Sequence, residues 1–188
     1  MALLPVAALV LAAAFTGDAN VVYRNPLRYA AWVTVVAALV HPAGRAFFHS
    51  FGVSRSSGRM LALVGIAAVP LLAFASTNIR LQRKASADLH VLMGHYGFMA
   101  AFAFTIITVG LLASLRPVGW RLTAWVAGLL PALLGVTSLL YPDTASSLDQ
   151  LWAIAAITWG AIFIAAAALT NDARSDLNSD APTSTEPA

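Results

Sequence analysis

The chain has 188 residues, of which 60% are hydrophobic and only 10% are charged, and its formal net charge is +3. Soluble domains carry roughly 25% charged residues, so this composition excludes an ordinary cytosolic enzyme, a nucleic-acid-binding protein and a disordered chain. The lack of cysteine also excludes disulfides, thiolate metal sites and iron–sulfur clusters. The composition therefore predicts an integral membrane protein.

Six apolar segments follow one another along the chain. A helix rises about 1.5 Å per residue, so crossing a hydrocarbon core about 30 Å thick takes roughly 17–25 apolar residues. Stretches such as 161–169 are apolar at every position, which favours helices over a barrel with alternating apolar and polar residues. We predict an all-α polytopic bundle of six transmembrane helices in one domain, 1–170, followed by a disordered acidic and polar tail, 171–188. The predicted segments are Met1–Gly17, Pro26–Phe48, Met60–Thr77, Leu89–Leu115, Gly119–Tyr141 and Leu151–Thr170.

The first two segments leave alternatives open. The first is near the lower length limit and contains Pro5, so it is either a transmembrane helix or a cleaved signal. No Lys or Arg precedes its apolar run, as a signal peptide would require, and this favours the helix. In the second segment, Pro42 suggests that the chain leaves the bilayer near His41 and continues as a short interfacial helix.

Proline and glycine mark the third and fifth segments. Pro70 and Pro131 each remove a helical hydrogen bond, which predicts either a packing kink or an opened carbonyl that lines a cavity. Gly128 and Gly135 lie seven residues apart on one face of the fifth segment. We expect this face to permit close contact with another helix.

The charges of the loops suggest an orientation in the cell membrane. With both termini in the cytoplasm, Lys and Arg divide almost evenly between the two sides, so the positive-inside rule decides little. The loops after the second and fourth segments hold no acid, whereas Asp18, Asp88, Asp143 and Asp149 share the other side. We therefore predict cytoplasmic termini, although the near balance leaves room for an antiparallel homodimer.

The four histidines invite a test for haem. His41 and His49 follow the second segment and His90 and His95 open the fourth, so the two pairs are expected at opposite membrane faces, too far apart to share one haem. Within one continuous helix, His90 and His95 would lie about 140° apart and point in different directions. His41, Arg45 and His49 share a helix face, which suits contact with anionic lipid headgroups.

One group of polar residues is a candidate functional site. It would form a mouth on the outer side of the membrane, able to admit an ion or a small anion or to contact a partner. The alternative is a solvated rim in which Asp88 and Asp149 stabilise the following helices by a favourable interaction with the positive ends of their dipoles. The candidate residues are Asp88, His90, His95, Tyr141, Asp143 and Asp149.

Motifs of enzymes are missing: the sequence holds no HExxH zinc motif, no GxSxG elbow and no glycine-rich phosphate loop. We expect no catalytic residue, cofactor or metal site. The stretches Gly94–Met99 and Trp120–Trp125 resemble those of small uncharacterised multi-pass membrane proteins of haloarchaea. The pair Leu89-His90, with Trp152 or Trp159 in the last segment, is similar to a broad prokaryotic family of six-helix membrane proteins of unknown function. Both resemblances imply the fold and neither implies an activity.

These observations predict a non-catalytic accessory or structural subunit of a membrane assembly. The alternative is a small oligomeric transporter or channel whose opening is the His/Asp mouth, and a third interpretation is a haem-bearing electron carrier. The expected partners are the lipid bilayer and either a second copy or another membrane protein, with no nucleic acid.

Overall fold

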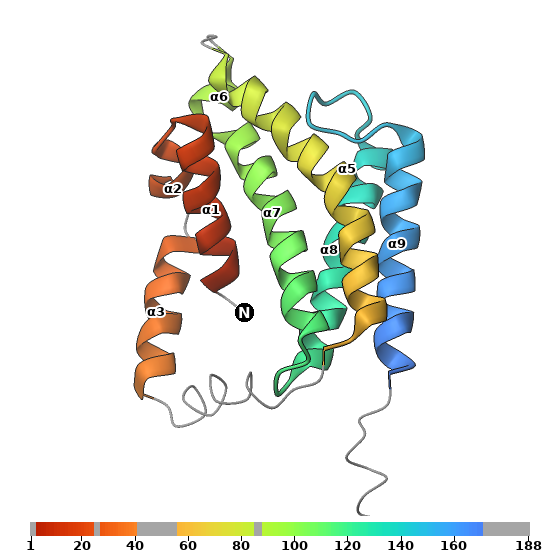
Figure 1. Ribbon diagram of the computed structural model, residues 1–188. Coiled ribbons are helices and arrows are strands. Elements are labelled where there is room, and N and C mark those ends of the chain that lie inside the picture. The colour runs from red at the N-terminus through yellow and green to blue at the C-terminus, as the bar shows by residue number, and fades with distance from the viewer. Residues whose placement is uncertain (1–2, 25–26, 41–55, 85–87, 171–188) are drawn as a thin grey trace, which may run out of the picture.

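The computed structural model describes residues 3–24, 27–40, 56–84 and 88–170. All regular structure in these ranges is helical, as predicted (Figure 1). Predictions for His41, Pro42, Arg45, His49 and the tail 171–188 lie outside the described residues. The helices are α1 (Leu3–Thr16), α2 (Asn20–Tyr23), α3 (Leu27–Val40), α5 (Gly58–Arg83), α6 (Leu89–Leu92), α7 (His95–Ser114), α8 (Trp120–Leu140) and α9 (Gln150–Ala168).

Four of these helices are long and apolar enough to cross a membrane. They are α5, α7, α8 and α9, with 26, 20, 21 and 19 residues. At about 1.5 Å per residue, even α9 reaches roughly the thickness of the hydrocarbon core. The chain is therefore a multi-pass membrane protein with four candidate spans. Six spans remain a prediction, because the 14-residue helices α1 and α3 each extend only about 21 Å within the described ranges.

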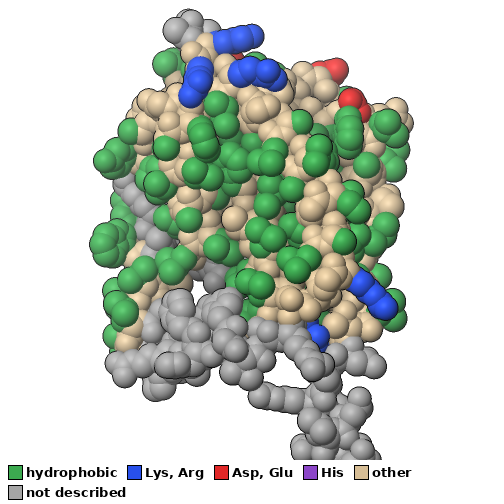
Figure 2. Space-filling model, in the orientation of Figure 1, with side chains coloured by type: hydrophobic (Ala, Val, Ile, Leu, Met, Phe, Trp, Pro, Cys, Tyr) green, Lys and Arg blue, Asp and Glu red, His purple; other side chains and the backbone are tan. Residues whose placement is uncertain are grey.

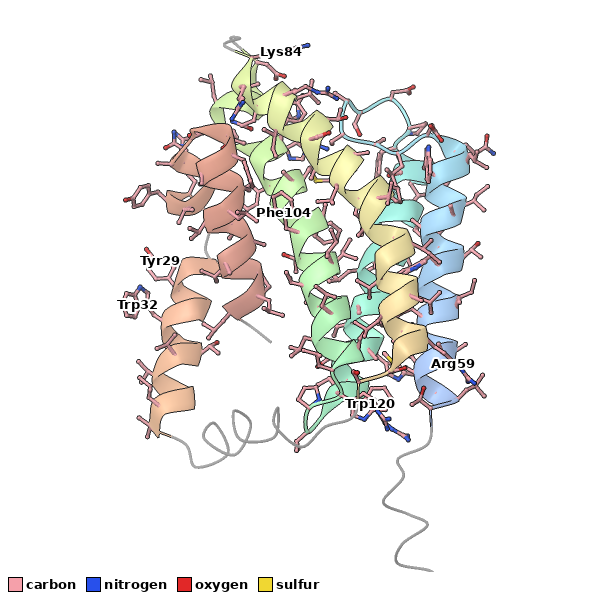
Figure 3. The ribbon with its side chains drawn as sticks, viewed as in Figure 1. Tyr29, Trp32, Arg59, Lys84, Phe104 and Trp120 are labelled. Atoms are coloured by element: carbon pink, nitrogen blue, oxygen red, sulfur yellow. The ribbon has the colours of Figure 1, made fainter. Side chains whose placement is uncertain are left out.

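Charged side chains gather at the two ends of the bundle. The visible face is covered by apolar side chains between an upper group of Lys, Arg and acidic residues and a lower group of Arg (Figure 2). Lys84 lies at one end, and Arg59 and Trp120 lie at the other (Figure 3). An apolar belt between two charged rims is the surface that a bilayer requires.

We name these ends the Lys84 end and the Trp120 end. The Lys84 end holds α6 and the loop 141–149, whereas the Trp120 end holds the turn 115–119 and the last residue of α9 (Figure 1). Helices α5, α7, α8 and α9 alternate in direction between them. Asp88, Asp143 and Asp149 accordingly share one end, and Arg59 and Arg116 share the other.

Two segment boundaries differ from the prediction. The third segment does not stop at Thr77, because α5 continues to Arg83. Asn78 and Gln82 are four residues apart and both are buried, so they face the bundle, while Arg80 and Arg83 in the last turn suit the negative end of the helix dipole. The fourth segment is not one helix either: Gly94 adopts φ +73° in the left-handed region and separates α6 from α7.

The predicted close contact of Gly128 and Gly135 is confirmed, and the partner helix is α9. A Cβ atom placed on Gly128 would lie 2.6 Å from the carbonyl oxygen of Gly160, and one placed on Gly135 would collide with the carbonyl oxygen of Ala153. The backbones of α8 and α9 therefore touch along this seam. The small residues of α8 serve contact within the chain.

Candidate functional site

The break at Gly94 brings His90 and His95 together. Their ring centroids are 5.4 Å apart and the rings meet edge to face at 66°. The expectation that these rings point in different directions is wrong, because it assumed a continuous helix from Leu89. The turn at Met93 and Gly94 reorients α6 relative to α7.

Asp88 organises this turn through both carboxylate oxygens. Oδ1 accepts the backbone N–H of His90 at 2.9 Å and lies 3.1 Å from His90 Nδ1. Oδ2 accepts the hydroxyl of Tyr96 at 3.2 Å. The carboxylate thus caps α6 and connects it to the first turn of α7.

These contacts hold the pKa of Asp88 below its usual value of 3.8. The backbone N–H of His90 is the largest cause, followed by the His90 side chain. A lowered pKa stabilises the fold above the usual value, and this stabilisation is lost as the pH falls through the folded-state pKa. We expect the carboxyl ¹³C shift of Asp88 to titrate with a midpoint below 3.8. A midpoint at or above that value would contradict the capping geometry.

His95 connects the turn to the loop 141–149. Its Nε2 lies 3.2 Å from Oγ of Ser146, a buried residue of that loop. A second loop contact runs from the backbone N–H of Leu148 to Oγ of Ser138 in α8, at 3.1 Å. Two hydroxyls therefore fix the loop over the histidines.

A cavity of about 540 Å³ lies between the turn that brings His90 and His95 together, α8 and the loop 141–149. Of the predicted mouth residues, His90, His95, Tyr141 and Asp143 line it. Asp88 is bonded to two lining residues and does not line the cavity itself. Asp149 lies apart: it caps α9 by accepting the backbone N–H of Trp152 at 3.1 Å.

The polar groups of this cavity suit a small hydrogen-bonding solute. Imidazole, phenol and hydroxyl groups can each donate or accept a hydrogen bond, and histidine can also change its charge near neutral pH. In the ranges that the structure covers, no three His, Cys, Asp or Glu side chains come together in a way that could hold a metal ion.

Sequence reasoning missed two members of this site. Tyr96 was expected only as part of a family-like stretch, and Ser146 was not considered. A hydroxyl in an irregular loop carries no periodic signal, so nothing in the sequence pointed to Ser146.

Sequence reasoning also missed Gln82, which joins three helices, α5, α6 and α7, to the turn between α1 and α2 at the Lys84 end. Its Nε2 donates to Oδ2 of Asp18 at 2.9 Å and to the carbonyl of Val91 at 2.7 Å, and its Oε1 accepts the backbone N–H of Gly97 at 3.1 Å. The first N–H groups of a helix have no partner within the helix. Gln82 of α5 thus caps α7, whose own N-cap is a glycine without a side chain.

Arg83, the next residue of α5, makes similar contacts with the C-terminal end of α1. Its Nε donates at 2.8 Å to the carbonyl of Phe15, and its NH2 group also donates to this oxygen. Phe15 is in the last turn of α1, where carbonyls lack helical partners. The end of α5 is therefore tied to α1 and to α7.

The chain matches no family model, no curated protein and no solved structure. The resemblance to small haloarchaeal membrane proteins and to the broad six-helix family stays a prediction. The candidate lipid contacts His41, Arg45 and His49 also stay a prediction, since they lie outside the described residues.

Proposed function

We propose that the protein is a non-catalytic accessory or structural subunit of a membrane assembly. The observation that carries this proposal is the position of α3, which lies at the edge of the bundle and contacts α1 (Figure 1). Tyr29 and Trp32 point away from the other helices (Figure 3). Trp32 is 71% exposed, and Val33, Val36 and Leu39 are also exposed.

A helix in this position suits contact with a neighbouring membrane protein. Exposed aromatic and branched side chains on a helix at the edge of the bundle can pack against a helix of a neighbouring protein as well as against lipid. A partner helix beside α3 would cover these side chains. Aromatic residues are also enriched in the energetically important centres of protein interfaces.

Replacing Trp32 with alanine tests this proposal. We expect a stoichiometric partner to co-purify with the tagged wild-type chain from native membranes, and its recovery to fall about tenfold with Trp32→Ala, as an interface anchor worth about 1.4 kcal/mol would give. Leu151→Ala on α9, equally exposed, is the matched control and should leave recovery unchanged. Recovery of the partner to the same extent with both variants would refute the role of α3.

The second candidate is a small oligomeric transporter or channel, and the cavity beside His90 and His95 favours it. The cavity combines imidazole, phenol and carboxyl groups at one end of the bundle. In proteoliposomes, His95→Ala and Asp88→Asn are then expected to reduce solute flux severalfold relative to wild type. Gln150→Ala, at the same end but outside the cavity, should have no effect. Equal flux through all of these proteins, or none, would favour the subunit.

The haem-bearing carrier remains a third interpretation. Purified protein with bound haem would show a Soret absorption band, and a spectrum without this band would remove the interpretation.

We also propose that both termini are cytoplasmic and that the N-terminal region adds two further crossings to the four candidate spans. Gly58 and Thr170 lie at the same end of the bundle, as four crossings require (Figure 1). Two further crossings before Gly58 would bring the N-terminus to that side as well. The arginines of the Trp120 end would then face the anionic inner leaflet.

A further inference from the structure

A second cavity, of about 580 Å³, lies at the Lys84 end between the turn that joins α1 to α2, the last turn of α5 and the short helix α6. It shares no lining residue with the cavity beside His90 and His95. Its charged lining consists of two cations, Arg24 and Arg83, and one acid, Asp18. The cavity therefore lies where the bundle meets water and holds more positive than negative charge.

The contacts of Arg83 leave one edge of its guanidinium unused. Nε and one terminal nitrogen donate to the carbonyl of Phe15, which fixes the side chain against the end of α1. The edge formed by the two terminal nitrogens has no partner among the described residues. Such an edge holds two parallel N–H donors, the arrangement that matches two oxygens of a phosphate.

Arg24, directly after α2, also keeps most of its donors. Its side chain makes one contact with the described residues, from a terminal nitrogen to Sδ of Met93 at 3.8 Å, and a thioether is a weak acceptor. In the part of the chain that the structure describes, neither Arg24 nor Arg83 forms an ion pair with a carboxylate. Asp18 lines the same cavity but uses both oxygens for hydrogen bonds to other groups of the protein.

The charges of the Lys84 end are also separated from one another. Figure 2 shows Lys and Arg side chains gathered near the upper tip of the molecule and acidic side chains to their right. Arg80 and Lys84, in and directly after the last turn of α5, add to the positive side. Asp143 and Asp149 belong to the loop before α9, and Asp88 is occupied by the contacts described above. An anion that approaches this end is therefore attracted to the side of the cavity.

Apolar side chains line the same cavity from α6 and the residue after it. Leu89, Leu92 and Met93 belong to this lining, and each is more than half exposed. A soluble anion would leave these side chains in water, whereas a molecule with an anionic head and an apolar body would cover them. The combination suits a lipid whose head lies at the membrane surface.

We propose that this cavity binds an anionic phospholipid, with its phosphate between the remaining guanidinium edges of Arg24 and Arg83 and its glycerol and first chain carbons against α6. Phosphatidylglycerol fits this site because its head adds no cation to the phosphate. The choline group of phosphatidylcholine would bring a positive charge toward two guanidiniums and is disfavoured. A volume of about 580 Å³ lies in the range of small-molecule sites, between roughly 300 and 1,000 Å³. The proposal does not depend on which side of the membrane this end faces.

Titration of the delipidated full chain with lipid in a neutral detergent, followed by native mass spectrometry, tests this proposal. We expect one phosphatidylglycerol to bind at least about fivefold more tightly than phosphatidylcholine, because only the second lipid places a cation near the arginines. Glycerol 3-phosphate has a similar head without the chains. It should bind at least about tenfold more weakly than the lipid, because it cannot cover the apolar side chains of α6.

Three variants separate this site from general attraction by positive charge. Arg24→Gln leaves the contact of α5 with α1 intact and should weaken binding of phosphatidylglycerol about tenfold, as the loss of a charge-assisted hydrogen bond would give. Arg83→Lys keeps the charge but not the paired donors, and it should also weaken binding. Arg80→Gln is the matched control, because it removes one charge from the same end outside the cavity and should leave the affinity unchanged.

Three results would overturn the proposal. Equal binding of phosphatidylglycerol and phosphatidylcholine would indicate an ordinary lipid contact. An equal loss with Arg80→Gln and Arg24→Gln would indicate attraction by the whole basic surface. Binding of glycerol 3-phosphate as tight as that of the lipid would indicate a soluble phosphate as the ligand.

Discussion

Gly135→Leu is expected to lower the free energy of unfolding by about 3 kcal/mol, the upper part of the usual range for overpacking. A side chain at this position would collide with the backbone of α9 at Ala153 and would meet the side chain of Ile157 2.8 Å from its first carbon. A flexible side chain can move aside, but a helix backbone can yield only if the whole helix moves. The substitution would therefore separate α8 from α9 along their seam.

Thermal unfolding in detergent measures this effect. We expect the midpoint to fall by roughly 6–12 °C, at 2–4 °C for each kcal/mol in a chain of this size. Gly65→Ala is the control, because a Cβ atom there has nothing within 4 Å and alanine is the better helix former. If both variants unfold at the wild-type temperature, α8 and α9 do not touch as described.

Gln82→Leu should lower the free energy of unfolding by about 1–3 kcal/mol. Leucine has a similar size but cannot replace any of the three hydrogen bonds, so the N–H of Gly97 would lose its side-chain partner, whereas the carbonyl of Val91 would still accept the N–H of Gly94. Each buried group left unpaired in this way costs about 1–3 kcal/mol. The loss of stability should be localised to the region where α1, α6 and α7 meet.

Hydrogen exchange locates this loss as well as measuring it. The amide of Gly97 should exchange much faster in Gln82→Leu, whereas amides in the middle of α8 should keep their protection. Gln150→Leu makes the same change at an exposed position of α9 and should alter neither. Unchanged exchange at Gly97 would show that Gln82 does not cap α7.

The helical membrane fold could be predicted because hydropathy acts over long windows. Runs such as 161–169 are apolar at every position and therefore form helices in lipid. The Gly128 and Gly135 pair predicted a close helix contact without identifying the partner helix. The break at Gly94 could not be predicted in this way, since a single glycine inside an apolar segment is also tolerated in a continuous helix. That one residue decides whether His90 and His95 face each other.

Contacts between polar residues that lie far apart in the sequence could not be predicted either. Gln82 and Asn78 look like the polar end of a segment, and only the packing of α5 against the bundle shows that they are buried. Their roles differ: Gln82 uses all of its hydrogen-bonding groups, and Asn78 leaves one unused. Local sequence patterns contain no information on that difference.

The central claim is that α5, α7, α8 and α9 cross the membrane in alternating directions. Because the chain has no cysteine, single cysteines report accessibility without interference. The positions are Lys84, Thr144 and Val118, all exposed, with the first two at the Lys84 end and the third in the turn 115–119. In intact cells treated with a membrane-impermeant maleimide, Lys84→Cys and Thr144→Cys should react alike, and Val118→Cys should behave in the opposite way. Labelling of all three under the same condition, before or only after permeabilisation, would contradict the four crossings.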